Sequence, residues 1–330
     1  MPNTSTNAVT LVTGGAGFIG SHLVRHLKSL GRSVRIVDDL STGRMENIAP
    51  LLDARCQLIQ ARLGDALRTQ PALLSNVAEV YHLAAAVGVR LVVNDPVRMI
   101  RNNVQETADL LDAAARTGIP VLITSSSEVY GRNPWMPLTE DQELIFGPTT
   151  SSRWSYGMSK ALDEHLALSW HHAQKLPVVI VRLFNTIGPR QVGQYGMVVP
   201  RFINWAVQHQ PIEIHGDGRQ TRSFCDVRDV VRAMPALLGN PRHHGEVFNL
   251  GSDAEISIEQ LADQIITLAH SRSGKLFVPY AQAFSGLFDD PQRRVPGLEK
   301  IRRAIGFAPQ YTLMQTLSEL IAQTRSGAIP

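Results

Sequence analysis

The stretch TGGAGFIG, residues 13–20, decides the fold of this chain of 330 residues. It follows a short β-rich run at residues 9–13 and precedes a helical pattern that runs through Leu23 and Leu27. A second apolar run, residues 33–37, comes next. A strand, a glycine turn, a helix and a second strand within about thirty residues predict the first unit of a dinucleotide-binding sheet.

The glycine turn and the acid that follows the second strand indicate the ligand. The glycines permit a tight turn, a close approach of the backbone to a pyrophosphate, and close packing of helix on strand. The N-terminus of the helix offers unpaired N–H groups and partial positive charge to phosphates. Asp38 is suited to a ribose diol and repels a 2′-phosphate, so we expect NAD rather than NADP, although Arg44 lies nearby. The expected cofactor contacts in the turn are Gly14, Gly17, Phe18, Ile19 and Gly20.

Strands and helices continue to alternate through the first half. Apolar runs at residues 57–60, 79–82 and 121–123 predict strands, and residues 98–117 predict a long helix. This alternation predicts the α/β class, with a Rossmann-type, doubly wound parallel sheet that binds ligands beyond the carboxyl ends of its strands. Further expected cofactor contacts are Asp65, Leu83, Ala84, Ala85 and Asn103.

Three of these positions keep a structural alternative. Asp65 either contacts the adenine or caps the helix that follows it. The small residues around Ala84 either let a flat ring system lie against the backbone or let a helix pack closely on the sheet. Asn103, near the start of its helix, could hold a strand-end loop.

The motifs TSSSEVYG, which begins at Thr124, and YGMSK carry the candidate catalytic groups. The first follows the fifth predicted strand and the second opens a helical pattern. Tyr156 and Lys160 are four residues apart and therefore share one face of that helix. Hydroxyls at a strand end that face a Tyr-Lys pair are suited to proton transfer. The expected catalytic residues are Ser126, Ser127, Glu128, Tyr156 and Lys160.

The composition excludes several classes of protein. The chain is 44% apolar and 18% charged, with a net charge of +3 and no Lys/Arg block, which argues against nucleic-acid binding. No apolar run reaches the ~20 residues of a membrane span, and no signal-type sequence is present, so we expect a cytoplasmic protein. Cys56 and Cys225 are too few for a disulfide framework or a metal cluster, and we expect two buried thiols and no metal.

After the sixth predicted strand the alternation becomes irregular, which predicts a smaller α/β substrate domain. We expect a cofactor domain over residues 1–185, with returning segments at residues 225–250, and a discontinuous substrate domain over residues 186–330. Arg222 and Arg294 are the expected ligands of a diphosphate or sugar, because the planar guanidinium pairs two oxygens at once.

Together the motifs resemble the extended short-chain dehydrogenase/reductases, and more narrowly the nucleotide-sugar epimerases, dehydratases and decarboxylases. Besides those quoted, the motifs HLAA, RLFNTIGPR, GDGRQTRSF, VFNLG and DDPQRRVPGLEK carry the resemblance, which covers essentially the whole chain. It implies permanently held NAD and a UDP-sugar substrate. It also implies that Tyr156 is the base, that Lys160 lowers its pKa, that Ser126 completes the triad, and that Asn185 lies against the substrate.

The resemblance also implies a shared first step of the reaction and three alternative later steps. In this group C4 of the sugar is oxidised first. The 4-keto sugar is then reduced on its other face, loses water, or, if C6 is a carboxylate, loses carbon dioxide. Dehydratases resemble Thr-Asp-Glu at residues 126–128, whereas this chain has Ser-Ser-Glu and lacks the acid. Ser127 and Glu128, with Arg294 before Val295, are similar to the UDP-glucuronate decarboxylases.

We therefore expect a UDP-glucuronate decarboxylase, a carboxy-lyase that yields UDP-xylose or its 4-keto precursor. In that reading Ser127 and Glu128 orient the carboxylate or the sugar ring. A UDP-glucuronate 4-epimerase giving UDP-galacturonate and a 4-epimerase of neutral UDP-sugars are the alternatives. A non-catalytic NAD-binding module is a remote one, because it predicts a broken triad. The family further implies a homodimer in which helices at residues 98–117 and 156–175 form a four-helix bundle.

Overall fold

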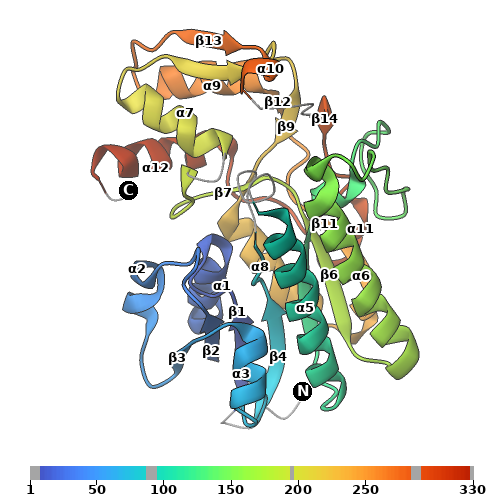
Figure 1. The fold of residues 1–330 in the computed structure, drawn as a ribbon. Coiled ribbons are helices and arrows are strands. Elements are labelled where there is room, and N and C mark those ends of the chain that lie inside the picture. Colours follow the sequence, from blue (N-terminus) through green and yellow to red (C-terminus); the bar gives the residue numbers. More distant parts are fainter. Residues whose placement is uncertain (1–7, 87–94, 194–196, 284–290, 328–330) are drawn as a thin grey trace.

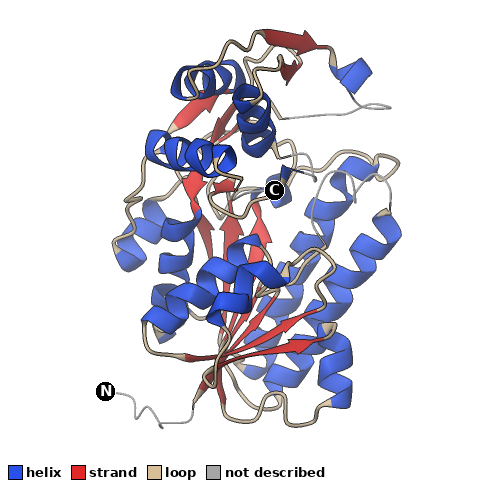
Figure 2. Cartoon of the chain, turned by 90° about the vertical axis from the view of Figure 1, so that its left-hand side faces the viewer, coloured by secondary structure: helices blue, strands red, loops and turns tan. Residues whose placement is uncertain are grey.

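The computed structural model describes residues 8–86, 95–193, 197–283 and 291–327. A parallel seven-stranded sheet of order β11-β6-β5-β4-β1-β2-β3 forms its centre (Figures 1 and 2). The strands are β1 (Val9–Thr13), β2 (Ser33–Asp38), β3 (Cys56–Gln60), β4 (Val77–His82), β5 (Val121–Ser126), β6 (Val178–Leu183) and β11 (Glu246–Leu250). The strand order reverses between β1 and β4, at the switch point where such sheets bind ligands. The predicted doubly wound α/β fold is confirmed.

Helices cover both faces of this sheet (Figure 2). One face carries α1 (Phe18–Ser29), α8 (Val227–Leu238) and α11 (Glu299–Ile305). The other face carries α3 (Leu63–Thr69), α5 (Pro96–Ala115) and α6 (Ser155–Gln174). The helix predicted at residues 98–117 begins two residues earlier, because Pro96 takes the first helical position and Asp95 caps it by accepting from the Arg98 N–H.

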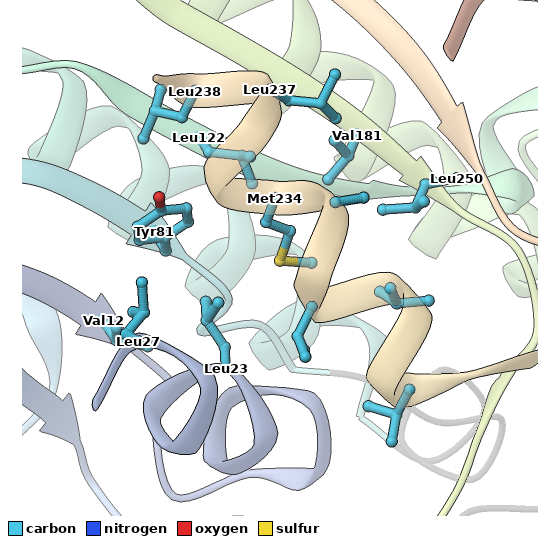
Figure 3. Packing of buried hydrophobic residues seen from close by; sticks show 14 of the residues in the cluster. Val12, Leu23, Leu27, Tyr81, Leu122, Val181, Met234, Leu237, Leu238 and Leu250 are labelled. Atoms are coloured by element: carbon cyan, nitrogen blue, oxygen red, sulfur yellow. The ribbon is translucent and has the colours of Figure 1, made fainter. Parts of the chain in front are cut away.

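Successive residues of the central strands point to opposite faces of the sheet, and each face has its own hydrophobic core. Leu122 joins the core under α1 and α8, whereas its neighbours Val121 and Ile123 join the core under α5 and α6. Figure 3 shows Met234 and Leu237 of α8 packed over the first of these cores. Both faces are therefore buried, which explains why the strands are continuous apolar runs rather than alternating ones.

A smaller lobe lies beyond the carboxyl ends of the strands and is drawn above the sheet in Figure 1. Its helices α7 (Val198–Val207), α9 (Ile258–Leu268) and α12 (Leu313–Arg325) enclose a separate apolar core. Its strands are β8 (Ile212–His215), β9 (Thr221–Ser223), β12 (Glu255–Ser257), β13 (Lys275–Val278) and β14 (Arg293–Arg294). Between these segments the chain returns to the larger unit as α8, β11 and α11.

Short elements complete the described chain. They are α2 (Met45–Ile48), η1 (Ala49–Leu51), η2 (Ser127–Tyr130), η3 (Ser152–Trp154), β7 (Thr186–Ile187), β10 (Cys225–Asp226), η5 (Pro241–His243) and α10 (Tyr280–Ala283). Both cysteines are buried free thiols, as expected. None of the helices in the described ranges combines the length and the apolar composition that a membrane crossing requires.

Candidate active site

A cleft of about 900 Å³ separates the carboxyl edge of the sheet from the smaller lobe. It is lined by the ends of β1, β4, β5 and β6, by η2, and by α7, β8 and β9 of the lobe. The predicted residues on its wall are Gly14, Gly17, Phe18, Ile19, Gly20, Asp38, Leu83, Ala84, Ala85, Asn103, Ser126, Ser127, Glu128, Tyr156, Asn185, Arg222 and Arg294. Two predicted residues, Asp65 and Lys160, do not line it.

The glycine turn provides one end of the cleft. Gly14 has a φ of +68°, which L side chains rarely adopt. A Cβ on Gly20 would collide with the carbonyl oxygen of Gly14, so only glycine lets α1 pack directly on the turn. No acidic residue stands in the first turn of α1, whose leading N–H groups have no intrahelical partners. These features fit the pyrophosphate of a dinucleotide.

Asp38 lies beside the turn and is held rigidly. Its Oδ2 accepts from the Ala16 N–H at 2.8 Å and its Oδ1 from the Leu40 N–H at 2.9 Å. Burial raises the pKa of Asp38, and these two hydrogen bonds oppose that rise. Each carboxylate oxygen keeps a lone pair for a ribose hydroxyl. Arg44 does not line the cleft, so the residues present fit NAD.

The structure places Asp65 outside the residues that line the cleft, which favours its structural alternative over a contact with the adenine. Because α3 begins at Leu63, Asp65 falls in the first turn of that helix, where its carboxylate pairs with Arg68. Ala61, Arg62 and Leu63, the three residues that follow the end of β3, line the cleft instead. The signal that could have identified these three residues is their position immediately after the strand, at its carboxyl end.

Asn103 holds the loop after β4, as one reading of the sequence proposed. Its Oδ1 accepts from the Ala86 N–H at 2.7 Å, and its Nδ2 donates to Oγ of Ser159 at 3.3 Å. The side chain therefore ties the strand-end loop to both α5 and α6. This contact fixes the small residues Ala84 and Ala85 on the cleft wall.

Tyr156 and Ser126 meet at the centre of the cleft wall. The Tyr156 phenol is hydrogen-bonded to the Ser126 hydroxyl, which also accepts from the Glu128 N–H at 3.2 Å. Burial raises the pKa of Tyr156, the negative charge of Glu128 raises it further, and the bond to Ser126 lowers it. Without a bound cofactor or substrate, the Tyr156 phenol is therefore protonated at neutral pH and can donate a proton.

Lys160 follows Tyr156 by one turn of α6 and pairs with an acid on the same helix. Its ammonium is buried and donates to Oδ2 of Asp163 at 2.7 Å. Burial is the largest cause that raises the pKa of Tyr156, and the Lys160 ammonium is paired with Asp163. That Lys160, together with a bound oxidised nicotinamide, lowers the pKa of Tyr156 stays a prediction. Lys160 lies behind the wall rather than on it.

Glu128 is clamped between two arginines. Its Oε1 pairs with Nη1 of Arg294 and its Oε2 with Nη1 of Arg153, both at 2.5 Å. Burial would raise the pKa of Glu128, but Arg294 and Arg153 outweigh burial and hold it well below its usual range. Arg153 was not predicted. The signal lay in its position three residues before Tyr156, where η3 leads into α6.

The predicted substrate residues come together from distant parts of the chain. Arg222 and Arg294 are paired neighbours on β9 and β14. Nδ2 of Asn185 donates to the carbonyl of Ser223 at 3.0 Å, which anchors β9 to the end of β6. The lobe adds unpredicted residues to the wall, among them Glu213, His215, Gln220 and Tyr280.

Comparisons with known proteins agree with this geometry. Residues 10–251 match the profile of the NAD dependent epimerase/dehydratase family. A UDP-N-acetyl-alpha-D-glucosaminuronate decarboxylase of Bacillus cytotoxicus is 37% identical over 94% of this chain and 96% of that protein. UDP-glucuronic acid decarboxylase 1 of Arabidopsis thaliana is 34% identical over 96% of this chain and 69% of that protein. The solved UDP-glucuronic acid 4-epimerase of Bacillus cereus, in complex with UDP-glucuronic acid and NAD, superposes with a TM-score of 0.84 at 30% identity, covering 96% and 99% of the two chains.

Proposed function

The chain belongs to the NAD-dependent epimerase/dehydratase family, and we propose that it removes the C6 carboxylate of a UDP-hexuronate, with UDP-glucuronate as the first candidate. NAD is its cofactor and, when bound, supplies reversible removal of hydride from C4 of the sugar. The glycine turn, Asp38 and the loop at Ala84 would hold it. The side chains of the protein position the sugar and move the protons.

The observation that carries the proposal is the cluster of Glu128, Arg153 and Arg294 on the cleft wall. One ionised carboxylate and two guanidinium groups leave the cluster with a single positive charge. It lies next to Tyr156, whose pKa responds to Glu128. A net cation built from arginines suits a sugar that carries a carboxylate, because guanidinium groups pair two oxygens at once.

The same cluster favours decarboxylation over epimerisation. A 4-epimerase must let the 4-keto sugar turn so that its other face can be reduced. A carboxylate held by Arg153 and Arg294, which are themselves fixed by Glu128, opposes that turn. A C6 carboxylate lies β to a C4 ketone, so the C5–C6 bond can break with its electron pair moving to the C4 oxygen. The protonated phenol of Tyr156, with Ser126 beside it, is suited to donate a hydrogen bond to that oxygen.

A second substrate has a specific observation in its favour. The Bacillus cytotoxicus relative acts, by its name, on a hexuronate that carries an N-acetyl group, and it is more similar to this chain than the Arabidopsis relative. UDP-N-acetylglucosaminuronate is therefore the second candidate. The two substrates share the C6 carboxylate and differ at C2.

The test is to incubate the protein with UDP-glucuronate, UDP-N-acetylglucosaminuronate and UDP-glucose in parallel and to follow the products by mass. Loss of the mass of carbon dioxide from either acid supports decarboxylation. An isomeric product without gas release contradicts it and favours an epimerase. Tyr156→Phe, which keeps the ring and removes the hydroxyl, is the control that should abolish turnover while NAD stays bound.

We also propose the two-domain division at residues 185 and 186, with the return of residues 225–250, and a homodimer. The separate apolar core of the lobe supports the first. Exposed apolar side chains on the two adjacent helices α5 and α6, at Val97, Ile100 and Leu162, support the second. The cytoplasm remains our proposed location, because two free thiols suit a reducing compartment.

A further inference from the structure

Asn249, in the VFNLG motif at residues 247–251, connects two segments of the active site from inside the protein. Its side chain is fully buried, and it lies beside Arg182 in the register of β11 and β6. Its Oδ1 accepts from the Tyr130 hydroxyl at 2.7 Å, and its Nδ2 donates to the carbonyl of Leu138 at 2.8 Å. One buried amide therefore holds two segments that are distant from it in the sequence.

The first contact holds the segment that carries Glu128. Tyr130 ends the short helix η2, two residues after Glu128. Burial raises the pKa of Tyr130 to about 12, so its phenol stays protonated and donates to Asn249. The guanidinium of Arg182 lies over the phenol ring, with 4.8 Å between Cζ and the ring centroid, and pairs with Glu164 of α6. Buried groups of β6, β11 and α6 therefore fix the end of η2.

The second contact holds the segment that carries Arg294. Leu138, whose carbonyl accepts from Asn249, donates its own N–H to the carbonyl of Val295 at 2.8 Å. Leu138 and Val295 are both buried, so water does not compete for this hydrogen bond. Val295 directly follows Arg294, and the bond therefore fixes the backbone beside the cluster.

We propose that Asn249 is a positioning residue that sets the place of Glu128 relative to Arg294, and thereby the orientation in which the cleft holds the C6 carboxylate of its substrate. The inference rests on the proposed function, in which Arg153 and Arg294, fixed by Glu128, hold that carboxylate. Glu128 and Arg294 are 166 residues apart, and Asn249 contacts the segments of both. An amide suits this role because it donates and accepts at once, and a hydrogen-bonded buried network specifies one geometry.

The test compares the affinities for UDP-glucuronate and UDP-glucose, measured by calorimetry on the protein with its bound cofactor. Every protein in the series also carries Tyr156→Phe, so that the sugars stay intact during the titration. The two sugars differ only in the carboxylate at C6, so the ratio of their dissociation constants reports the hold on that group. We expect Tyr130→Phe, which removes one bond to Asn249, to lower the preference for the acid about tenfold. Asn249→Ser, which removes both bonds, should lower it further, and the affinity for UDP-glucose should not change.

Tyr81→Phe is the matched control. Tyr81 is an equally buried tyrosine, but it belongs to the core under α1 and α8, where its hydroxyl donates to Glu79. The loss of this hydroxyl should leave the ratio of the two dissociation constants unchanged. A general loss of stability would instead weaken the binding of both sugars, in the control as in the other variants.

An unchanged ratio in Asn249→Ser would overturn the inference, and so would an equal loss of affinity for both sugars. A parent protein that binds the two sugars equally would overturn it as well. Tyr130→Phe provides the same test if Asn249→Ser does not fold. Because binding needs no turnover, a ratio that falls as expected in a protein that decarboxylates neither acid would refute the proposed function and retain this inference. Decarboxylation of UDP-glucuronate together with an unchanged ratio would do the reverse.

Discussion

At the residue scale, Arg153 connects the cluster of Glu128, Arg153 and Arg294 to α6, the helix that carries Tyr156. Its guanidinium stacks over Trp154, which is buried, with 5.3 Å between Cζ and the ring centroid, so the Glu128 contact is made by a restrained side chain. A lysine at this position would bring one charge without the planar fork. The residue is therefore suited to hold a carboxylate in a fixed orientation.

The first prediction concerns this residue. Arg153→Lys should lower kcat/KM for the acidic UDP-sugar about 10- to 100-fold, because Glu128 loses one of its two guanidinium partners. NAD binding should not change, since the cofactor wall lies elsewhere. The measurement is steady-state kinetics with cofactor content determined after denaturation. Arg68→Lys, on the surface of α3, is the matched control and should have no effect; equal kinetics for Arg153→Lys and wild type would contradict the role.

At the element scale, the glycine turn is the feature on which the cofactor domain depends. Gly20→Ala places a methyl group against the Gly14 carbonyl, so α1 must move away from β1. We predict loss of bound NAD and a lower melting temperature, measured by cofactor absorbance and thermal unfolding. Gly274→Ala is the control, because its added methyl group would contact nothing within 4 Å. Retention of NAD by Gly20→Ala at wild-type stability would contradict this account.

The helices, strands and turns differ in how far the sequence predicts them. The strands of the sheet and the turn at residues 13–20 depend on local periodicity and on glycine chemistry, and both were predicted. The cluster around Glu128 depends on Arg294, which is 166 residues away, and on Arg153 of the short helix η3, where no periodic pattern marks it. Whether Asp65 or the residues before it line the cleft is also beyond local patterns, since a shift of two or three residues after the strand end decides which side chain faces the cleft. The sequence therefore predicts residues that a local motif marks, and it does not predict Arg153, whose contact with Glu128 is formed only by the fold.

At the scale of the whole molecule, two neutral histidines couple folding to pH. Burial lowers the pKa of His82 to about 3 and that of His22 to about 4, against an ordinary value of 6.5. Below pH 6.5 the unfolded chain binds protons that the folded chain does not, so stability falls as the pH falls. Each histidine should cost about 1.4 kcal/mol per pH unit well below 6.5 and above its folded pKa.

The prediction is that His22→Gln makes the free energy of unfolding less dependent on pH between 6.5 and 4 than in the wild type. Urea unfolding at a series of pH values measures the slope. His172→Gln, an exposed position on α6, leaves both buried rings in place and should keep the wild-type slope. Identical slopes for His22→Gln and wild type would show that folding does not lower the pKa of this ring.

We expect two chains to associate through the outer face of α5 and α6. Val97 is 60% exposed and Leu162 is 46% exposed, and these two long helices pack directly against each other. A second copy that covers this face would bury both side chains, which removes apolar area from water at about 25 cal/mol per Å². Leu162→Glu would place a charge in that interface, where an unpaired carboxylate is costly.

We therefore predict that the wild type is a dimer at micromolar concentration and that Leu162→Glu is a folded monomer. Size-exclusion chromatography with light scattering gives the masses, and circular dichroism verifies the fold. Leu276→Glu on β13 is the matched control, because Leu276 is equally exposed at 49% but lies on the smaller lobe. Dissociation by Leu276→Glu with a stable Leu162→Glu dimer would place the interface on the lobe, and a monomeric wild type would remove the four-helix bundle altogether.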